Sequence, residues 1–189
     1  MRFFLILLGL ILSTDLMADP NAQLAWEDKT RSSLIMKIKG PDKELNSCIE
    51  SGAEMQYRME IKRCRQYRLL WRECTREVVE THHLRFDSIN QTYNLRRDRF
   101  RDGSEPYTEI FKARTAAIRA LRVVRNIPIN QLAFNQESRL APDEYILARA
   151  FSVCSARSNK TLSGLSTFFT LGMIKLDGFD TGWRQYNLE

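Results

Sequence analysis

Residues 53–64 read AEMQYRMEIKRC, and their side chains alternate between polar and apolar from one position to the next. The apolar members are Met55, Tyr57, Met59 and Ile61, and every residue between them is polar or charged. A period of two is typical of a β-strand with one buried and one solvated face. The segment therefore predicts a half-buried strand and places antiparallel β-structure at the centre of the fold.

Two further strands follow this segment along the chain. A connection of about ten residues leads to a second predicted strand at 75–86, whose Val78, Leu84 and Phe86 share one side. Residues 87–90 (DSIN) are typical of a tight turn, and a third predicted strand passes through Tyr93 and Leu95. Consecutive strands joined by short connections most simply form an antiparallel meander.

The residues before the central strand predict two opening strands and a short helix. Apolar residues alternate over 24–28 and again over 34–38, with a break near 31–33. Pro41 and the acidic residues after it favour a helix start, and Leu45 and Cys48 lie on one helical face. Gly52 is the expected end of this helix.

The second half of the chain predicts one long helix and one more strand. Residues 106–124 carry apolar side chains at helical spacing, ahead of Pro128. Residues 143–156 alternate with apolar side chains on both faces, which favours a strand inside a sheet. The interrupted apolar stretch 162–176 favours a core cover or a strand, with an interfacial membrane segment as the alternative. We expect an α+β fold, mainly antiparallel β in a two-layer sheet or sandwich, with an immunoglobulin-like arrangement as one form.

The amino terminus predicts export. Arg2 precedes an apolar run at 3–12, and residues 13–18 turn polar and end on Ala18. This order is typical of a cleaved signal peptide, and the run is shorter than the roughly 20 apolar residues of a membrane-spanning helix. Removing 18 of the 189 residues leaves 171, the size of one domain at 19–189. We expect a periplasmic or cell-envelope protein with no transmembrane segment after cleavage.

Four cysteines in an exported chain predict two disulfides, for which three pairings exist. Cys64 and Cys74 flank the connection between the first two meander strands, so strand pairing would bring them face to face. This favours Cys64–Cys74 and leaves Cys48 for Cys154. No cysteine or histidine spacing resembles a zinc site, and we expect no metal and no cofactor.

The chain is basic, with 29 Lys and Arg against 23 Asp and Glu and a net charge of +6. An exported basic protein meets acidic proteins or anionic surface components before it meets nucleic acid, so we expect no nucleic-acid partner. Arginines concentrate between residues 58 and 76, close to aromatic side chains. A solvated strand face is the simpler interpretation, and a binding face is the functional one. Its candidate residues are Arg58, Arg63, Arg65, Tyr67, Arg68, Trp71, Arg72 and Arg76.

Catalytic motifs are weak throughout the sequence. His82 and His83 are neighbours in a strand, so they point to opposite faces and cannot hold one ion together. Glu80 and His82 share a face and would serve as an acid–base pair, although a solvated or cross-strand pair is more ordinary. There is no nucleophile elbow, phosphate loop or dinucleotide fingerprint. We therefore expect no catalytic residues in a binding or accessory module, with a small hydrolase acting near Glu80 and His82 as the alternative.

The order of these features resembles a known family. A short helix ends in CIESG at 48–52 and leads directly into the alternating strand, Trp71 lies in the next connection, and LRFD at 84–87 precedes TYNL at 92–95. A Gly-Trp pair follows at 182–183. This resembles the bacterial envelope family catalogued as domain of unknown function 4390, from about Trp26 to Trp183. The resemblance implies a small exported protein, mainly β with one or two helices, and brings no catalytic residues. Four cysteines depart from the family pattern.

Overall fold

The computed structural model describes residues 20–67, 71–99, 105–134, 140–155 and 178–188. The expected signal peptide at 1–18 and the apolar stretch at 162–176 lie outside these residues. The elements of the described part are β1 Asn21–Trp26, β2 Ser33–Lys39, α1 Asp42–Glu50, β3 Glu54–Tyr67, β4 Trp71–Cys74, β5 Val78–Asp87, β6 Thr92–Arg99, β7 Tyr107–Phe111, α2 Arg114–Leu121, β8 Val123–Pro128, the 3-10 helix η1 Ile129–Leu132, β9 Glu144–Ser155 and β10 Arg184–Tyr186.

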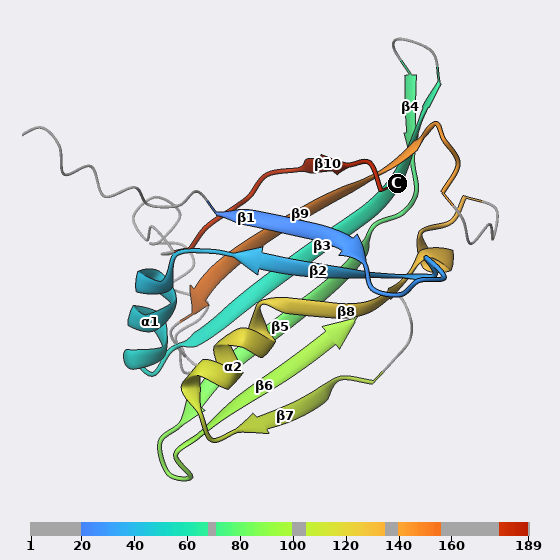
Figure 1. Cartoon of the computed structure of the whole chain (residues 1–189). Helices are drawn as coiled ribbons and strands as arrows, with labels where there is room; N and C mark the ends of the chain where they lie inside the picture. The colour runs from blue at the N-terminus through green and yellow to red at the C-terminus, as the bar shows by residue number, and fades with distance from the viewer. Residues whose placement is uncertain (1–19, 68–70, 100–104, 135–139, 156–177, 189) are drawn as a thin grey trace, which may run out of the picture.

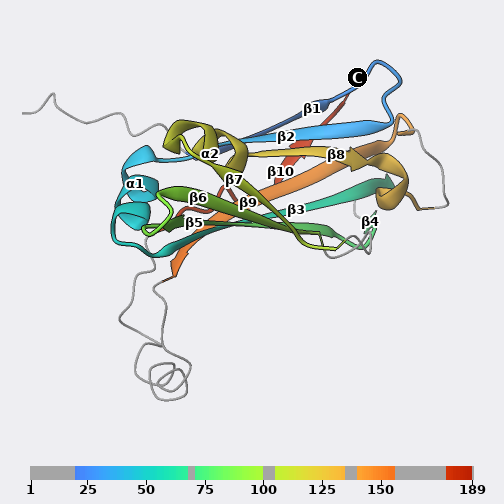
Figure 2. The same cartoon turned by 90° about the horizontal axis from the view of Figure 1, so that it is seen from below.

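Two antiparallel sheets form two layers in the described part of the chain (Figures 1 and 2). The small sheet has the order β1-β2-β8, and the large sheet has the order β10-β9-β3-β5-β6-β7, with β4 paired to one end of β3. Helix α2 lies beside β8 in the layer of the small sheet, and α1 lies at one end of the two layers. The expected α+β fold with a two-layer antiparallel core is confirmed.

The predicted meander is the centre of the large sheet. Strand β3 pairs with β5, with Met59 opposite Glu80, and β5 pairs with β6, with Leu84 opposite Leu95. On its other side β3 pairs with β9 over twelve residues, from Glu54 opposite Ser155 onwards. Because β3 pairs with β5 on one side and with β9 on the other along most of its length, it is a central strand of the large sheet.

The alternation in β3 separates the core from the outer face of the large sheet. Met55, Tyr57 and Met59 are almost completely buried and face the small sheet, which contributes Leu34 and Met36 of β2 to the same core. Side chains between them point to the opposite face. Burial of such residues at about 25 cal/mol per Å² of apolar surface is the main force that holds the two layers together.

Helix α1 begins and ends where the sequence predicts. Its C-cap is Ser51, and Gly52 follows with a φ of 75°, a left-handed conformation that glycine adopts without a Cβ clash. The N–H of Gly52 donates to the carbonyl of Ile49, so one of the last helical carbonyls is satisfied. The chain then enters β3 with its apolar face already turned toward the core.

The predicted long helix at 106–124 is wrong. The structure divides this segment into the strand β7, the eight-residue helix α2 and the strand β8. Tyr107 and Phe111 of β7 are aromatic, and aromatic side chains favour a strand. The paired β-branched residues Val123 and Val124 favour a strand again, directly after α2. Within this segment, helical spacing therefore corresponds to a helix only over the eight residues of α2.

Candidate functional site

The end of β3 and the whole of β4 form a small hairpin that extends from the large sheet (Figure 1). Cys64 lies opposite Cys74 in the register, and Tyr67 lies opposite Trp71. The two cysteines are joined by a disulfide. We call Cys64–Tyr67 with Trp71–Cys74 the stapled hairpin. The Cys64–Cys74 bond predicted from strand pairing is confirmed.

The stapled hairpin presents aromatic and basic side chains to solvent. Trp71 is 78% exposed and Tyr67 is 46% exposed, in contrast to the aromatic residues of the core. The guanidinium of Arg65 lies 5.9 Å from the centre of the Tyr67 ring and donates from Nη1 to the Tyr67 hydroxyl at 3.2 Å. Arg72 is exposed beside Trp71. An indole and a phenol held this way offer a large contact surface with little loss of side-chain freedom on binding.

The foot of the stapled hairpin, at Cys64 and Cys74, packs against β9, whereas its outer end, at Tyr67 and Trp71, is exposed. Cys64 is fully buried and clusters with Tyr145 and Leu147 of β9. The backbone continues the ladder past the disulfide, because the N–H of Thr75 donates to the carbonyl of Arg63 at 2.8 Å. The disulfide therefore lies at the boundary between the buried sheet and the exposed hairpin.

Glu144, the first residue of β9, anchors the same foot. Its fully buried carboxylate accepts from Arg63 Nε at 2.9 Å, from Arg63 Nη2 and from Arg65 Nη2 at 2.7 Å. The backbone N–H of Ala141 donates to it at 2.7 Å. Burial alone would raise the pKa of Glu144, but the Ala141 N–H and the two guanidinium groups outweigh burial and hold its pKa below the usual value.

The remaining arginines of the predicted binding face do not share one surface. Arg63 is completely buried, so its assignment to a binding face is wrong: it lies on the core side of β3 and neutralises Glu144. Arg58 lies on the outer face of the large sheet, where it donates to Glu60 at 2.9 Å. Arg76 is exposed in the link between β4 and β5. Arg68 lies outside the described residues.

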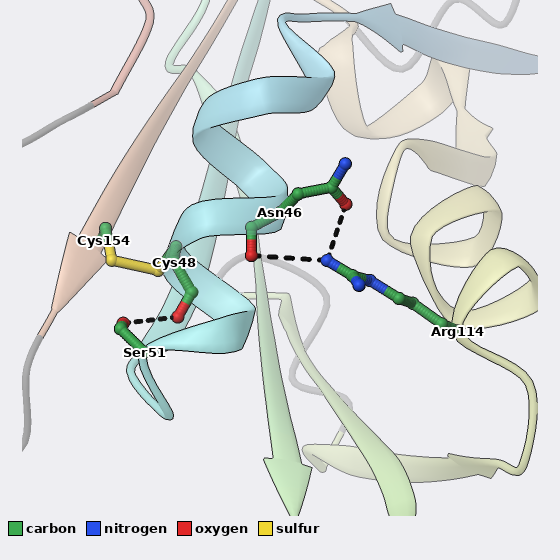
Figure 3. The surroundings of a disulfide bond; sticks show 5 residues. All are labelled: Asn46, Cys48, Ser51, Arg114 and Cys154. Atoms are coloured by element: carbon green, nitrogen blue, oxygen red, sulfur yellow. Dashed lines mark hydrogen bonds between the residues drawn. A yellow bond between two sulfur atoms is a disulfide. The ribbon is translucent and has the colours of Figure 1, made fainter.

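The second predicted disulfide, Cys48–Cys154, is confirmed and joins α1 to β9 (Figure 3). Ser51 donates from its hydroxyl to the Cys48 carbonyl at 2.7 Å. On the other side of α1, Arg114 donates from Nη2 to the side-chain oxygen of Asn46 at 2.8 Å and to the Asn46 carbonyl at 3.3 Å (Figure 3). Helix α1 is thus tied to β9 covalently and to the first residue of α2 by hydrogen bonds.

His82 is completely buried, and Glu80 beside it is almost completely buried. Nε2 of His82 lies 2.7 Å from Glu80, and Nδ1 lies 2.8 Å from the Leu121 carbonyl at the end of α2. Arg99 donates to the second oxygen of Glu80 at 2.7 Å. Burial would raise the pKa of Glu80, but the bond with His82 and the charge of Arg99 outweigh it and lower this pKa. Both ring nitrogens of His82 therefore contact protein oxygens and hold α2 on the sheet.

His83 points to the opposite face of the large sheet, as the strand pattern predicts. Its Nδ1 lies 2.7 Å from Glu54, and its Nε2 lies 3.4 Å from Asp98. Among the described residues, no group of three or more His, Cys, Asp or Glu side chains has an arrangement that could hold a metal ion. No helix among these residues combines the length and apolar character needed to cross a membrane.

The chain matches no family model, no curated protein and no solved structure. The site must therefore be interpreted from its own geometry. Sequence reasoning identified Arg65, Tyr67, Trp71 and Arg72, which the structure brings together on one hairpin. It missed Glu144, whose link to Arg63 spans 81 residues of chain, and no local spacing signals such a contact.

Proposed function

We propose that this protein is a non-enzymatic binding or accessory module that engages a partner protein through the stapled hairpin. The observation that carries the proposal is Trp71, 78% exposed on a strand that contributes no buried side chain. Exposed aromatic side chains cost solubility, and a Trp–Tyr–Arg group is the composition found at the centres of protein interfaces. The disulfide and Glu144 hold this group in place before binding, which reduces the entropy lost on association.

The expected partner is an acidic protein of the cell envelope. The chain has a net charge of +6, and Arg65, Arg72 and Arg76 lie on or next to the hairpin. Complementary charge accelerates association and selects among partners. Two disulfides are typical of an oxidising compartment such as the periplasm. Signal-peptide cleavage after Ala18 and membership in the envelope family resembled by residues 26–183 belong to the same proposal.

The hydrolase alternative gains no support from the described residues. His82 is completely buried, and its two ring nitrogens contact Glu80 and the backbone of Leu121. A general base must come within hydrogen-bonding distance of a substrate proton. The Glu80–His82 arrangement is already used to position α2.

In-cell cross-linking of the tagged protein, followed by mass spectrometry of captured species, tests the proposal. The Trp71→Ala/Arg72→Glu variant should lose a reproducible envelope partner, because removing a central Trp typically weakens binding by about 2 kcal/mol, or roughly thirtyfold. The control variant Arg85→Glu/Ile89→Ala makes the same charge reversal and truncates an apolar side chain on exposed residues of the β5–β6 hairpin, and it should retain the partner. Equal capture by both variants would reject the stapled hairpin as the docking element.

A further inference from the structure

A cavity of about 900 Å³ lies between α2 and β8 on one side and β6 and β7 on the other. This volume falls within the range of small-molecule sites. Its wall carries five cationic side chains from four different elements: Lys37, Arg97, Arg99, Arg119 and Arg125. We call it the cationic cavity. It is distinct from the stapled hairpin, and nothing proposed above uses it.

Two carboxylates also line the cationic cavity, but both are paired. Glu80 bonds to His82 and Arg99, and Glu109 lies 3.1 Å from Arg97 Nε. Five cations against two carboxylates leave an excess of positive charge. A cleft lined by one sign of charge focuses the field and raises the local concentration of anions.

The arginines at the back of the cavity are held rigidly by backbone oxygens. Arg97 donates to the carbonyls of Ala120 at 3.3 Å and Val123 at 3.2 Å. Arg99 donates to the carbonyls of Asn126 and Arg125, each at 3.0 Å. These bonds fix both guanidinium groups at the junction of α2 and β8, so their charges need no rearrangement when a ligand enters.

Two other cations are available to a ligand. Lys37 on β2 and Arg119 on α2 are exposed, and within the described ranges neither has a hydrogen bond or ion pair. Lys37 and Arg119 also line a second cavity of about 630 Å³, so they lie between the two cavities. Arg125 is also exposed, and its Nη1 lies 3.7 Å from Glu27. Positive charges on the same cavity wall repel one another, and a bound anion would reduce this repulsion.

We propose that the cationic cavity binds a ligand that bears phosphate groups. A phosphate carries up to two charges on oxygens that accept several hydrogen bonds at once, so it can meet Lys37 and Arg119 together. The fixed Arg97 and Arg99 supply the positive potential behind it. Tyr107, 55% exposed on the cavity wall, offers a hydroxyl donor, and its ring lies 5.9 Å from the Arg97 guanidinium. Phospholipid headgroups and soluble phosphate esters share this chemistry.

Calorimetric titration of the intact protein with inorganic pyrophosphate tests this site. Saturable binding of one pyrophosphate is expected, weakened at least about tenfold in Lys37→Glu/Arg119→Glu, because two charge-assisted contacts become repulsive. The control Lys43→Glu/Arg85→Glu has the same charge change on exposed residues that do not line the cavity, and its affinity should stay within about twofold. Thermal melting of both variants establishes that each is folded.

Three results would overturn the proposal: no saturable binding, an equal loss of affinity in both variants, or equally tight binding of citrate. The first would mean that the cavity is not an anion site, the second that only net charge attracts the anion, and the third would remove the preference for phosphate. Vesicles containing phosphatidylglycerol distinguish the sources of phosphate. Vesicle binding that pyrophosphate competes away indicates a lipid headgroup, and pyrophosphate binding without vesicle binding indicates a soluble phosphate ester.

Discussion

Two hairpins of the large sheet are built in opposite ways. The β5–β6 hairpin closes through its turn, where Asp87 accepts from the N–H groups of Ile89 at 3.0 Å and Asn90 at 3.2 Å. Both of its strands contribute to the core. In the stapled hairpin, β4 pairs with β3 alone and buries no side chain, and a disulfide closes it. Turn hydrogen bonds and burial in the core stabilise the β5–β6 hairpin, whereas a disulfide stabilises the stapled hairpin.

This difference indicates what the stapled hairpin is for. An isolated two-stranded hairpin is marginally stable in water unless something else supports it. Here Cys64–Cys74 and the buried Arg63–Glu144 pair supply that support, yet three of the four residues of β4 are exposed and Cys74 is partly buried. A supported element whose outer end stays exposed is best explained by what Tyr67 and Trp71 present to solvent.

The largest effects should come from the disulfides. In the chain-entropy model, the Cys48–Cys154 bond, with a separation of 106 residues, contributes about 5 kcal/mol, and the Cys64–Cys74 bond, with a separation of 10, contributes about 3 kcal/mol. Urea unfolding of Cys48→Ala/Cys154→Ala and Cys64→Ala/Cys74→Ala should show losses in that order. A larger loss for the hairpin variant would mean that the stapled hairpin supports the whole fold, and the contrast between hairpins would fail.

Removing the negative charge of Glu144 should lower the free energy of unfolding nearly as much as removing a disulfide. Glu144→Gln removes the buried carboxylate charge that pairs with Arg63 and Arg65, and it should lower the free energy of unfolding by about 3 kcal/mol. The matched control is Glu73→Gln, an exposed carboxylate on β4 opposite Arg65, expected within about 0.5 kcal/mol of wild type. Chemical denaturation measures both, and equal values would show that Glu144 is not the anchor.

Acid should weaken the same anchor. The pKa of Glu144 is lower in the folded protein than in the unfolded chain, where glutamate titrates near about 4.3. Its contribution is therefore complete above that pH and is lost as the pH falls toward the folded value. Glu80, whose pKa is also lowered, contributes in the same direction. Unfolding free energy measured from pH 7 downward should fall less steeply in Glu144→Gln than in wild type; parallel curves would contradict this assignment.

The smallest stability effects should come from the exposed tips. Trp71→Ala on the stapled hairpin and Ile89→Ala on the β5–β6 turn remove side chains that are 78% and 90% exposed. Each should change the free energy of unfolding by less than about 0.5 kcal/mol. A loss of about 2 kcal/mol for Trp71→Ala would instead indicate a packing role. Thermal melting at neutral pH is sufficient for both variants.

Local sequence patterns predicted much of this fold. Alternation from Met55 to Ile61 predicted β3 and its buried face, and the pairing of β3 with its successor predicted Cys64 opposite Cys74. The same alternation, continued to residue 63, places Arg63 on the core side of β3. The position of Arg63 in this alternation therefore indicates burial, although arginine is a residue type that is mostly exposed.

The rest depended on contacts between distant residues. Spacing at 106–124 fits a helix, yet β7 and β8 pair with β6 and β2, and those partners decide the conformation. Glu144 meets Arg63 across 81 residues, and the cationic cavity gathers side chains from β2, β6, α2 and β8. No local window contains these combinations. The exposure of Trp71 likewise follows from the position of β4 beyond the end of β5.

Site-specific photo-cross-linking compares the two hairpins directly. Benzoyl-phenylalanine is introduced in place of Trp71 or in place of Ile89, and each protein is irradiated in the cell. Both positions are exposed at hairpin ends, and only the first belongs to the proposed docking element. We predict one defined envelope protein cross-linked from position 71 and none from position 89. The same species from both positions, or a defined partner from position 89 alone, would contradict the stapled hairpin as the binding site.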